Sequence, residues 1–264
     1  MQEVTQKQVT TCLKALGIVS GDGLLVHSAV QFLGRPVGGL RMYLDTIREI
    51  ISPDGTLVVP TFNFGFARGE SFDPRSTPSP EMGVFSEFVR QLPEARRTIH
   101  PLQSIAVVGR YRDDLTVRDT ASAFDAGSAF ERMLELDFKL LLLGASSRAV
   151  AMFHYCEQRA NVPYRYWKDF TGAVRTPEGW QTRTYRMFAR DLELDPVLTI
   201  DPVVAYLQSL GQWRSQPLNY GQVTVCNLRD FVVAADKFLA EDPWALVTNV
   251  RVKPDGTVER RQAG

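Results

Sequence analysis

The sequence predicts an α/β protein in which a single domain is built on a mixed sheet. Residues 23–62 follow the pattern strand, helix, strand, which is typical of a βαβ unit with parallel pairing. The apolar run 140–143, ended by Gly144, has the length and composition of a buried strand. Residues 182–189 and 222–227 alternate apolar and polar side chains, as half-exposed strands do. These observations favour one α/β domain with a mixed sheet.

Helical and strand patterns alternate along the first half of the chain. Val9, Leu13 and Leu16 are spaced as on a helix over 4–16, and Gly17 is the expected C-cap. The next elements expected are strand 23–28, a helix with its buried stripe at Leu40, Leu44, Ile47 and Ile51, strand 56–62, a helix over 83–92 and strand 104–109. Between them, residues 63–82 are long and irregular, which is usual for a functional loop.

The second half is less regular, and residues 160–220 are its least legible part. We expect a loop and short helix over 125–138, strand 140–143, and then a helix that starts near Arg148 with Ser147 as its N-cap. After strand 222–227, a helix carries Leu228, Phe231, Ala235 and Phe238 on one face, and a terminal hairpin turns about 254–256.

Composition narrows the function classes. The chain has 264 residues, 44% of them hydrophobic, with 30 basic and 30 acidic side chains. This balance argues against a nucleic-acid or polyanion binder, which usually has a basic excess. No apolar run approaches the roughly 20 residues of a membrane span, and the N-terminus lacks the pattern of a signal peptide. Cys12, Cys156 and Cys226 are far apart, so we expect reduced thiols in a cytoplasmic protein.

One stretch, 139–165, combines a strand, a polar loop and a helix, and we expect the site there. Three residues separate His154 from Glu157, so their side chains share one face of the helix. Ligands of open α/β sheets collect outside the carboxyl ends of the strands, where this loop and helix begin. A histidine beside a carboxylate has the parts of a general base and the group that orients it. The alternative for Glu157 is a solvated helix residue paired with Arg148 or Arg159.

The chain has only three histidines, and each follows or ends a predicted element. His27 ends strand 23–28, His100 precedes strand 104–109, and His154 lies on the helix after strand 140–143. Their distribution over three strand ends suggests that they converge on one site. For any single histidine, a packed and hydrogen-bonded role in the fold is the more common alternative, and for His27 the two readings are evenly balanced.

Four blocks of sequence together resemble the aminoglycoside 3-N-acetyltransferase family, the antibiotic N-acetyltransferases that are unrelated in fold to the GNAT enzymes. The resemblance spans residues 5–245. The blocks are LVHS at 25–28 with GG at 38–39, DGTLVVPTF at 54–62, STPS at 76–79 with MG at 82–83 and HPLQS at 100–104, and LLG at 142–144 with HYCE at 154–157 and VP at 162–163.

The resemblance implies a fold and a reaction. It implies a single three-layer α/β domain over 1–264, in which helices flank a central mixed sheet. It implies transfer of an acetyl group from acetyl-CoA to the 3-amino group of 2-deoxystreptamine in an aminoglycoside, or to a related amino sugar, and hence antibiotic resistance. Direct transfer would need a base, for which His154 is the candidate, with Glu157 to hold its tautomer and His27 near the thioester. No metal is expected, and a homodimer is left open.

Coenzyme A should bind mainly through its diphosphate and pantetheine. Gly38 and Gly39 enter a helix whose N-terminus offers free N–H groups to phosphate, although two glycines also suit a plain flexible turn. The candidate cofactor-binding residues are Ser28, Ala29, Val30, Arg35, Val37, Gly38, Gly39 and Ser104. The aromatic residues Phe62, Phe64 and Phe66 could meet the adenine or cap the substrate, but alternating aromatics are more often strand packing.

A polycationic acceptor favours carboxylates, and the candidate substrate-binding residues are Asp73, Glu81, His100 and Asp125. Two departures from the family pattern bear on activity. A threonine commonly stands where this chain has Ala151, and a second serine where it has Ala29. The lost hydroxyls leave open an acceptor other than an aminoglycoside, or a CoA-binding protein without catalysis.

Two other classes remain as alternatives. A hydrolase could use Ser28 or Cys156 with His154 and Glu157, but the chain has no GxSxG motif. Three histidines and nearby carboxylates could bind zinc, but no local ligand spacing requires it.

Overall fold

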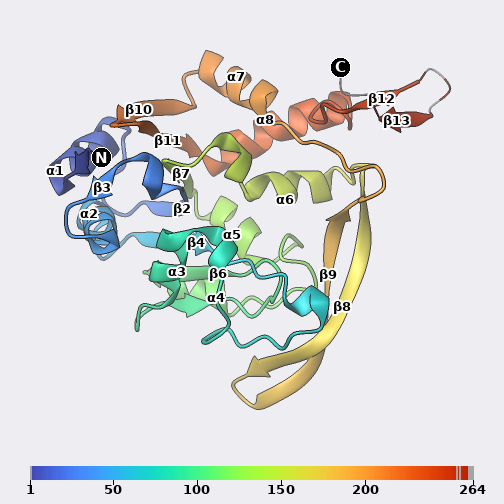
Figure 1. Ribbon diagram of the computed structural model, residues 1–264, viewed down its shortest axis with the longest axis horizontal. Helices are drawn as coiled ribbons and strands as arrows, with labels where there is room; N and C mark the ends of the chain where they lie inside the picture. Colours follow the sequence, from blue (N-terminus) through green and yellow to red (C-terminus); the bar gives the residue numbers. More distant parts are fainter. Residues whose placement is uncertain (1, 254, 256, 261–264) are drawn as a thin grey trace.

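The protein is built on a seven-stranded mixed sheet (Figure 1). The computed structural model describes residues 2–253, 255 and 257–260. In order across the sheet the strands are β10 (Arg214–Leu218), β11 (Gly221–Asn227), β7 (Lys139–Leu143), β2 (Gly23–Ser28), β4 (Thr56–Pro60), β6 (Ile105–Gly109) and β5 (Arg96–Arg97). The three central strands β7, β2 and β4 are parallel, and every pairing outside them is antiparallel.

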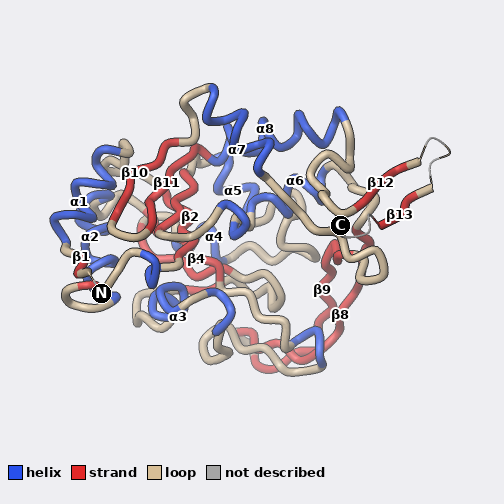
Figure 2. The backbone as a smooth tube through the Cα atoms, turned by 45° about the horizontal axis from the view of Figure 1, so that its top comes forward, coloured by secondary structure: helices blue, strands red, loops and turns tan. Residues whose placement is uncertain are grey.

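Helices cover both faces of this sheet and make the three predicted layers (Figure 2). Successive side chains of a strand point to opposite faces, so Leu24 and Val26 pack with one set of helices and Leu25 with the other. The first set is α1 (Gln6–Ala15), α2 (Leu40–Ile51) and α3 (Val84–Arg90). The second set is α4 (Arg112–Thr116), α5 (Ala129–Glu135), α6 (Met152–Arg159), α7 (Asp201–Ser209) and α8 (Leu228–Glu241).

A long hairpin of β8 (Arg165–Thr176) and β9 (Gly179–Arg190) leaves the body of the molecule (Figure 1). It is tied to the rest by a small cluster of Phe66, Phe72, Leu102, Val174 and Tyr185, and by a bridge between Phe72 and Val174. The smaller elements are β1 (Glu3–Val4) paired with β3 (Arg35–Pro36), β12 (Val250–Val252) paired with β13 (Val258–Arg260), and the 3-10 turns η1 (Val30–Phe32), η2 (Phe66–Arg68), η3 (Pro80–Met82) and η4 (Ser147–Ala149).

The structure confirms the predicted α/β class, the mixed sheet and the βαβ unit of β2, α2 and β4. The expected strands 182–189 and 222–227 lie within β9 and β11, and the terminal hairpin is present as β12 and β13. Pro254 and Gly256, expected at its turn, lie outside the described residues. No helix within the described part of the chain is long and apolar enough to cross a membrane.

One prediction of local structure is wrong, and several elements were not predicted. Ser147 does not cap the helix: residues 147–149 form η4, and α6 starts only at Met152 because the backbone of Val150 is extended while its side chain enters the core. Strand β8, helix α7 and strand β10 have no counterpart among the expected elements. Nearly all of β8 is exposed or half-buried, so its side chains lack the regular apolar alternation that reveals a strand.

Candidate active site

A cavity of about 310 Å³ opens at the carboxyl ends of the three parallel strands. Strand β2 contributes His27, strand β4 ends at Pro60 on its wall, and the segment after β7 contributes the stretch 147–151. The full lining is His27, Pro60, Phe62, Phe64, Met82, Ser147, Arg148, Ala149, Val150, Ala151, Phe153, His154, Leu198 and Ile200. This is the position that the sheet topology predicts for a ligand.

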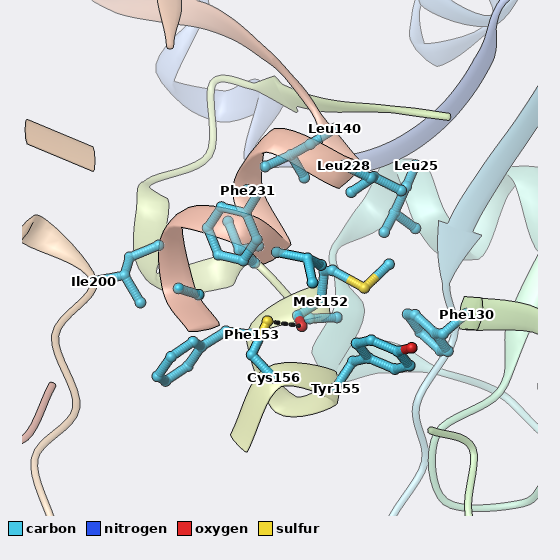
Figure 3. Close-up of a cluster of buried hydrophobic side chains, with 14 of the residues drawn as sticks. Leu25, Phe130, Leu140, Met152, Phe153, Tyr155, Cys156, Ile200, Leu228 and Phe231 are labelled. Carbon is cyan, nitrogen blue, oxygen red and sulfur yellow. Dashed lines mark hydrogen bonds between the residues drawn. The ribbon is translucent and has the colours of Figure 1, made fainter. Parts of the chain in front are cut away.

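The turn after β7 brings the start of α6 to this cavity. Gly144 has φ +74°, and a Cβ there would lie 2.7 Å from the carbonyl oxygen of Ala29, so only glycine fits between the ends of β7 and β2. The inner face of α6, with Met152 and Cys156, packs among side chains of the sheet and of α5 and α8 (Figure 3). That packing fixes the helix axis and therefore the position of His154.

His154, Glu157 and Arg165 form a compact cluster at the edge of the cavity. The Nδ1 atom of His154 lies 2.7 Å from Oε2 of Glu157, and Nη2 of Arg165 forms an ion pair with the same oxygen at 2.9 Å. The His154 side chain keeps 34% of its surface exposed, whereas the Glu157 side chain is fully buried. The alternative that Glu157 is a solvated helix residue is therefore wrong, because Arg165 and His154 hold it inside the protein.

The contact with Glu157 favours one tautomer of His154. A carboxylate oxygen can only accept, so the 2.7 Å contact favours a proton on Nδ1, and Nε2 of the neutral ring then keeps its lone pair. Burial alone would raise the pKa of Glu157, but the hydrogen bond and charge of His154 and the charge of Arg165 outweigh it and lower that pKa. The carboxylate is thus ionised and holds the ring in one orientation.

His27 is the second histidine of the cavity, and it is almost completely buried. Its Nε2 accepts a hydrogen bond from the backbone N–H of Ala151 at 3.3 Å. Burial, and secondarily the charge of His154, lower the pKa of His27 to about 3, so this ring is neutral at physiological pH. The structure shows features of both interpretations of His27. The ring is buried and hydrogen-bonded to the backbone, and it also lines the cavity.

The third histidine does not join them, so the expected convergence of all three is wrong. His100 is buried against Tyr185, with ring centroids 4.9 Å apart, and its Nδ1 accepts from the N–H of Gln103. Burial lowers its pKa to about 4. It lies next to the cluster that anchors the hairpin and not among the lining residues, which places it in the framework.

Seven of the eight predicted cofactor-binding residues divide into two groups and Ser104 lies apart from both, and none of the eight lines the cavity. The first group surrounds the start of α2. Gly38 and Gly39 both have positive φ, no side chain caps the helix, and a Cβ on Gly39 would meet nothing within 4 Å. Arg35 and Val37 are exposed beside them, with Arg35 paired to Glu3. This is open space next to a helix N-terminus, the arrangement that suits a phosphate.

The second group lies at or near the end of β2. Ala29 donates its N–H to the carbonyl of Leu143, and Val30 is buried in the core. The Ser28 hydroxyl oxygen is buried and has no hydrogen-bond partner among the described residues. Because alternate residues of a strand face opposite ways, Ser28 points away from the face of β2 that carries His27.

Ser104 is not available to a cofactor, which corrects that prediction. It is fully buried, its hydroxyl donates to the carbonyl of Thr61 at 2.8 Å, and it accepts from Nε of Arg97 at 2.9 Å. Arg97 also bonds the carbonyls of Thr61 and Thr77 and covers the ring of Phe72. This buried network ties the irregular segment 63–82 to the sheet, so Ser104 has a structural role.

The predicted substrate carboxylates are not among the residues that line the cavity. Asp73 accepts from the N–H of Arg75 in a local turn, and Asp125 bonds the backbone of Ser122 and the amide of Gln158. Glu81 is exposed on η3, next to the lining residue Met82. Of the three, only Glu81 has no hydrogen bond or ion pair recorded within the described chain.

Several lining residues carried no signal in the sequence. Leu198 and Ile200 come from the segment before α7, whose secondary structure the sequence did not reveal. Arg148 lies after strand β7, a position at which a charged side chain can contact a ligand, but it was not predicted as a site residue. Arg165 was not recognised because the strand that it begins was not predicted. Phe62 and Phe64 do line the cavity, whereas Phe66 packs in the hairpin cluster.

Cys156 is not a nucleophile candidate in this geometry. It is fully buried in the core, its thiol points to the backbone carbonyl of Met152, and burial raises its pKa well above the usual range (Figure 3). Within the described residues, no group of three or more His, Cys, Asp or Glu side chains is placed to hold a metal ion.

Comparisons with known proteins identify the family. The aminoglycoside 3-N-acetyltransferase family model matches residues 25–240. An aminoglycoside N(3)-acetyltransferase III from a Salmonella species is 29% identical over 263 residues, which covers 89% of this chain and 91% of the relative. A structure described as AAC-IIIb in binary complex with CoASH superposes with a TM-score of 0.80 at 23% identity, over 91% of this chain and 97% of that one. The YokD protein from Bacillus subtilis superposes with a TM-score of 0.78 at 19% identity, over 92% and 95% of the two chains. Because the family match covers most of its length, this chain belongs to the aminoglycoside 3-N-acetyltransferase family and is an acetyltransferase by that membership.

Proposed function

We propose that this enzyme transfers an acetyl group from acetyl-CoA to an amine of an aminoglycoside or a related amino sugar, with His154 as the general base. The observation that carries the proposal is the Glu157–His154 pair at the edge of the cavity. The pair leaves Nε2 of a half-exposed histidine free to accept a proton. Family membership and the name of the Salmonella relative support the reaction class.

In the proposed reaction His154 Nε2 accepts a proton from the acceptor nitrogen as that nitrogen attacks the thioester carbonyl carbon. A C–N bond forms, the C–S bond breaks, and the sulfur leaves as the thiol with the proton that the His154 imidazolium passes on to it, which returns the base to its starting state. Glu157 stabilises the imidazolium that forms on His154, as the buried carboxylate of a catalytic triad does. Transfer within one ternary complex needs no acyl-enzyme, which agrees with the burial of Cys156.

Acetyl-CoA supplies the acetyl group as an activated thioester. The mainly apolar lining, with Pro60, Phe62 and Phe153 among it, would shield the reacting centre from water. The open N-terminus of α2, with Gly38, Gly39 and the neighbouring Arg35, suits the diphosphate. The hydroxyl of Ser28 at the end of β2, which has no hydrogen-bond partner among the described residues, is a candidate donor to the cosubstrate.

Thiol release from acetyl-CoA tests the proposal, with a panel of 2-deoxystreptamine aminoglycosides, simple amino sugars and small amines. His154→Gln keeps the size of the side chain and removes the base, so we expect release to fall by a factor of about 10² to 10⁴. Release that survives this substitution would overturn the role of His154. Release confined to non-sugar amines would overturn the acceptor class, and CoA binding without release on any amine would point to a member that has lost catalysis.

A further inference from the structure

The contacts of Arg165 point to a function in catalysis that is separate from its place in the hairpin. It is the first residue of β8, only 10% of its side chain is exposed, and its Nη1 donates to the carbonyl of Phe188 on β9 at 3.1 Å. Its Nη2 lies 2.9 Å from Oε2 of Glu157 and 3.2 Å from Nδ1 of His154. The guanidinium therefore touches both members of the pair and not the cavity itself.

Arginine and histidine compete here for one oxygen. Nδ1 of His154 lies 2.7 Å and Nη2 of Arg165 2.9 Å from Oε2 of Glu157, while Oε1 of the same carboxylate is buried and has no hydrogen-bond partner among the described residues. Arginine is always protonated and has no acceptor atom, so with the proton on Nδ1 the 3.2 Å approach of Nη2 to Nδ1 brings two donors together. The contact is unfavourable once the imidazole becomes a cation, because two positive groups then adjoin in a partly buried site.

We infer that Arg165 is a positioning residue that keeps Glu157 ionised and oriented while it restrains His154 from becoming protonated before the acceptor arrives. A histidine beside a buried carboxylate alone would gain the full attraction of that charge and would hold its proton more tightly. Arg165 offsets part of that attraction. This inference depends on the proposed role of His154.

The other charged and titratable groups around His154 do not replace this effect. From β2, the neutral ring of His27 faces it, and from η4, Arg148 lines the same cavity. The loop before α5 contributes the uncharged ring of Phe124, whose centroid is 6.1 Å away. Arg165 and Glu157 are the charged side chains in direct contact with the imidazole within the described residues.

The experiment is an NMR titration of histidine imidazoles, which three histidines make tractable. The His154 signal is assigned by its loss in His154→Gln. In Arg165→Gln we expect its titration midpoint to rise by about 1 to 2 pH units, and the acid limb of the kcat/KM profile to rise with it. Arg165→Lys keeps the charge and should leave the midpoint near that of the parent protein.

Arg190 provides a matched control, because it is the cross-strand partner of Arg165 but is exposed and paired with Asp195. Arg190→Gln should leave the midpoint unchanged. An unchanged or lowered midpoint in Arg165→Gln would overturn the inference, as would an equal rise in Arg190→Gln.

If Arg165→Gln does not fold, the titration midpoint of His154 is compared instead between two proteins that both carry Glu157→Gln and therefore lack the buried carboxylate. Glu157→Gln/Arg165→Gln removes both charges and should titrate at higher pH than Glu157→Gln, by a similar amount. Equal midpoints would overturn the inference. The NMR titration does not depend on turnover. Thiol release that persists in His154→Gln would contradict the proposed reaction, whereas the NMR midpoints test the role of Arg165 separately.

Discussion

The parallel core and the β8–β9 hairpin contribute to the same site in opposite ways. Strands β7, β2 and β4 are buried on both faces, and their order alone brings His27 and the start of α6 to one end of the sheet. The hairpin pairs along twelve residues of each strand but is anchored by a small cluster, and much of its surface is exposed. It reaches the site chiefly through Arg165. The core thus positions the site by topology, and the hairpin adds one buried charge.

The largest contrast expected between the two regions is in stability. Leu141→Ala removes a fully buried side chain of β7, and we expect a loss of about 2 to 5 kcal/mol of unfolding free energy. Trp180→Ala, near the exposed turn of the hairpin, removes a side chain that is 51% exposed and should cost less than about 1 kcal/mol. Urea denaturation measures both. Equal losses would mean that the hairpin is as integral to folding as the sheet.

A second prediction concerns Glu157, the carboxylate on α6 that contacts Arg165 of the hairpin. Glu157→Gln keeps the shape of the side chain but weakens the hold on His154 and leaves Arg165 without its counter-charge. We expect kcat/KM for the acceptor to fall about a hundredfold, near 2.7 kcal/mol of transition-state stabilisation. Glu135→Gln, an exposed carboxylate paired with Arg132, is the control and should have no effect. A parent-like rate in Glu157→Gln would exclude the pair as the catalytic unit.

Acidification probes one buried histidine in each region. His27 in the core and His100 by the hairpin cluster have pKa values of about 3 and about 4, below the ordinary 6.5. Between pH 6.5 and those values the unfolded chain binds protons that the folded chain does not, so stability falls as pH falls. We expect a loss of up to about 1 kcal/mol per pH unit from each histidine.

The slope of unfolding free energy between pH 6.5 and 5 measures this effect, since most carboxylates are still ionised there. His100→Gln should remove about half of the slope. A slope that is the same in His100→Gln and in the parent would attribute the acid sensitivity to other groups.

The smallest effect on activity is expected at Ala151, where the chain departs from the threonine that is common in the family. Ala151 lines the cavity and donates its N–H to His27, so Ala151→Thr would place a hydroxyl beside that ring and the reacting centre. One added donor there should raise kcat/KM by less than about tenfold. Ala160→Thr, at the exposed end of the same helix, is the matched control. A large fall in Ala151→Thr would show that this chain has adapted to the smaller residue.

Prediction from sequence succeeded where local pattern and topology agree. The apolar run of β7, Gly144 after it and the spacing of His154 and Glu157 were sufficient to place the pair at the carboxyl ends of the strands. Prediction failed where one residue depends on a distant partner. Ser104 resembled a site residue, but the buried guanidinium of Arg97 occupies its hydroxyl, and His100 is drawn into the framework by Tyr185.

The sequence by itself determined the α/β class and the neighbouring pair on α6, because buried strands and helical spacing leave periodic patterns in a single chain. It determined the family through four blocks of sequence that resemble it. Only the tertiary structure decided which of three histidines meet, that Glu157 is buried, and that Arg165 completes the cluster. The physical reason is that a polar side chain takes its role from its partners and its burial. For these residues the partners come from strands and loops that the chain brings together only on folding.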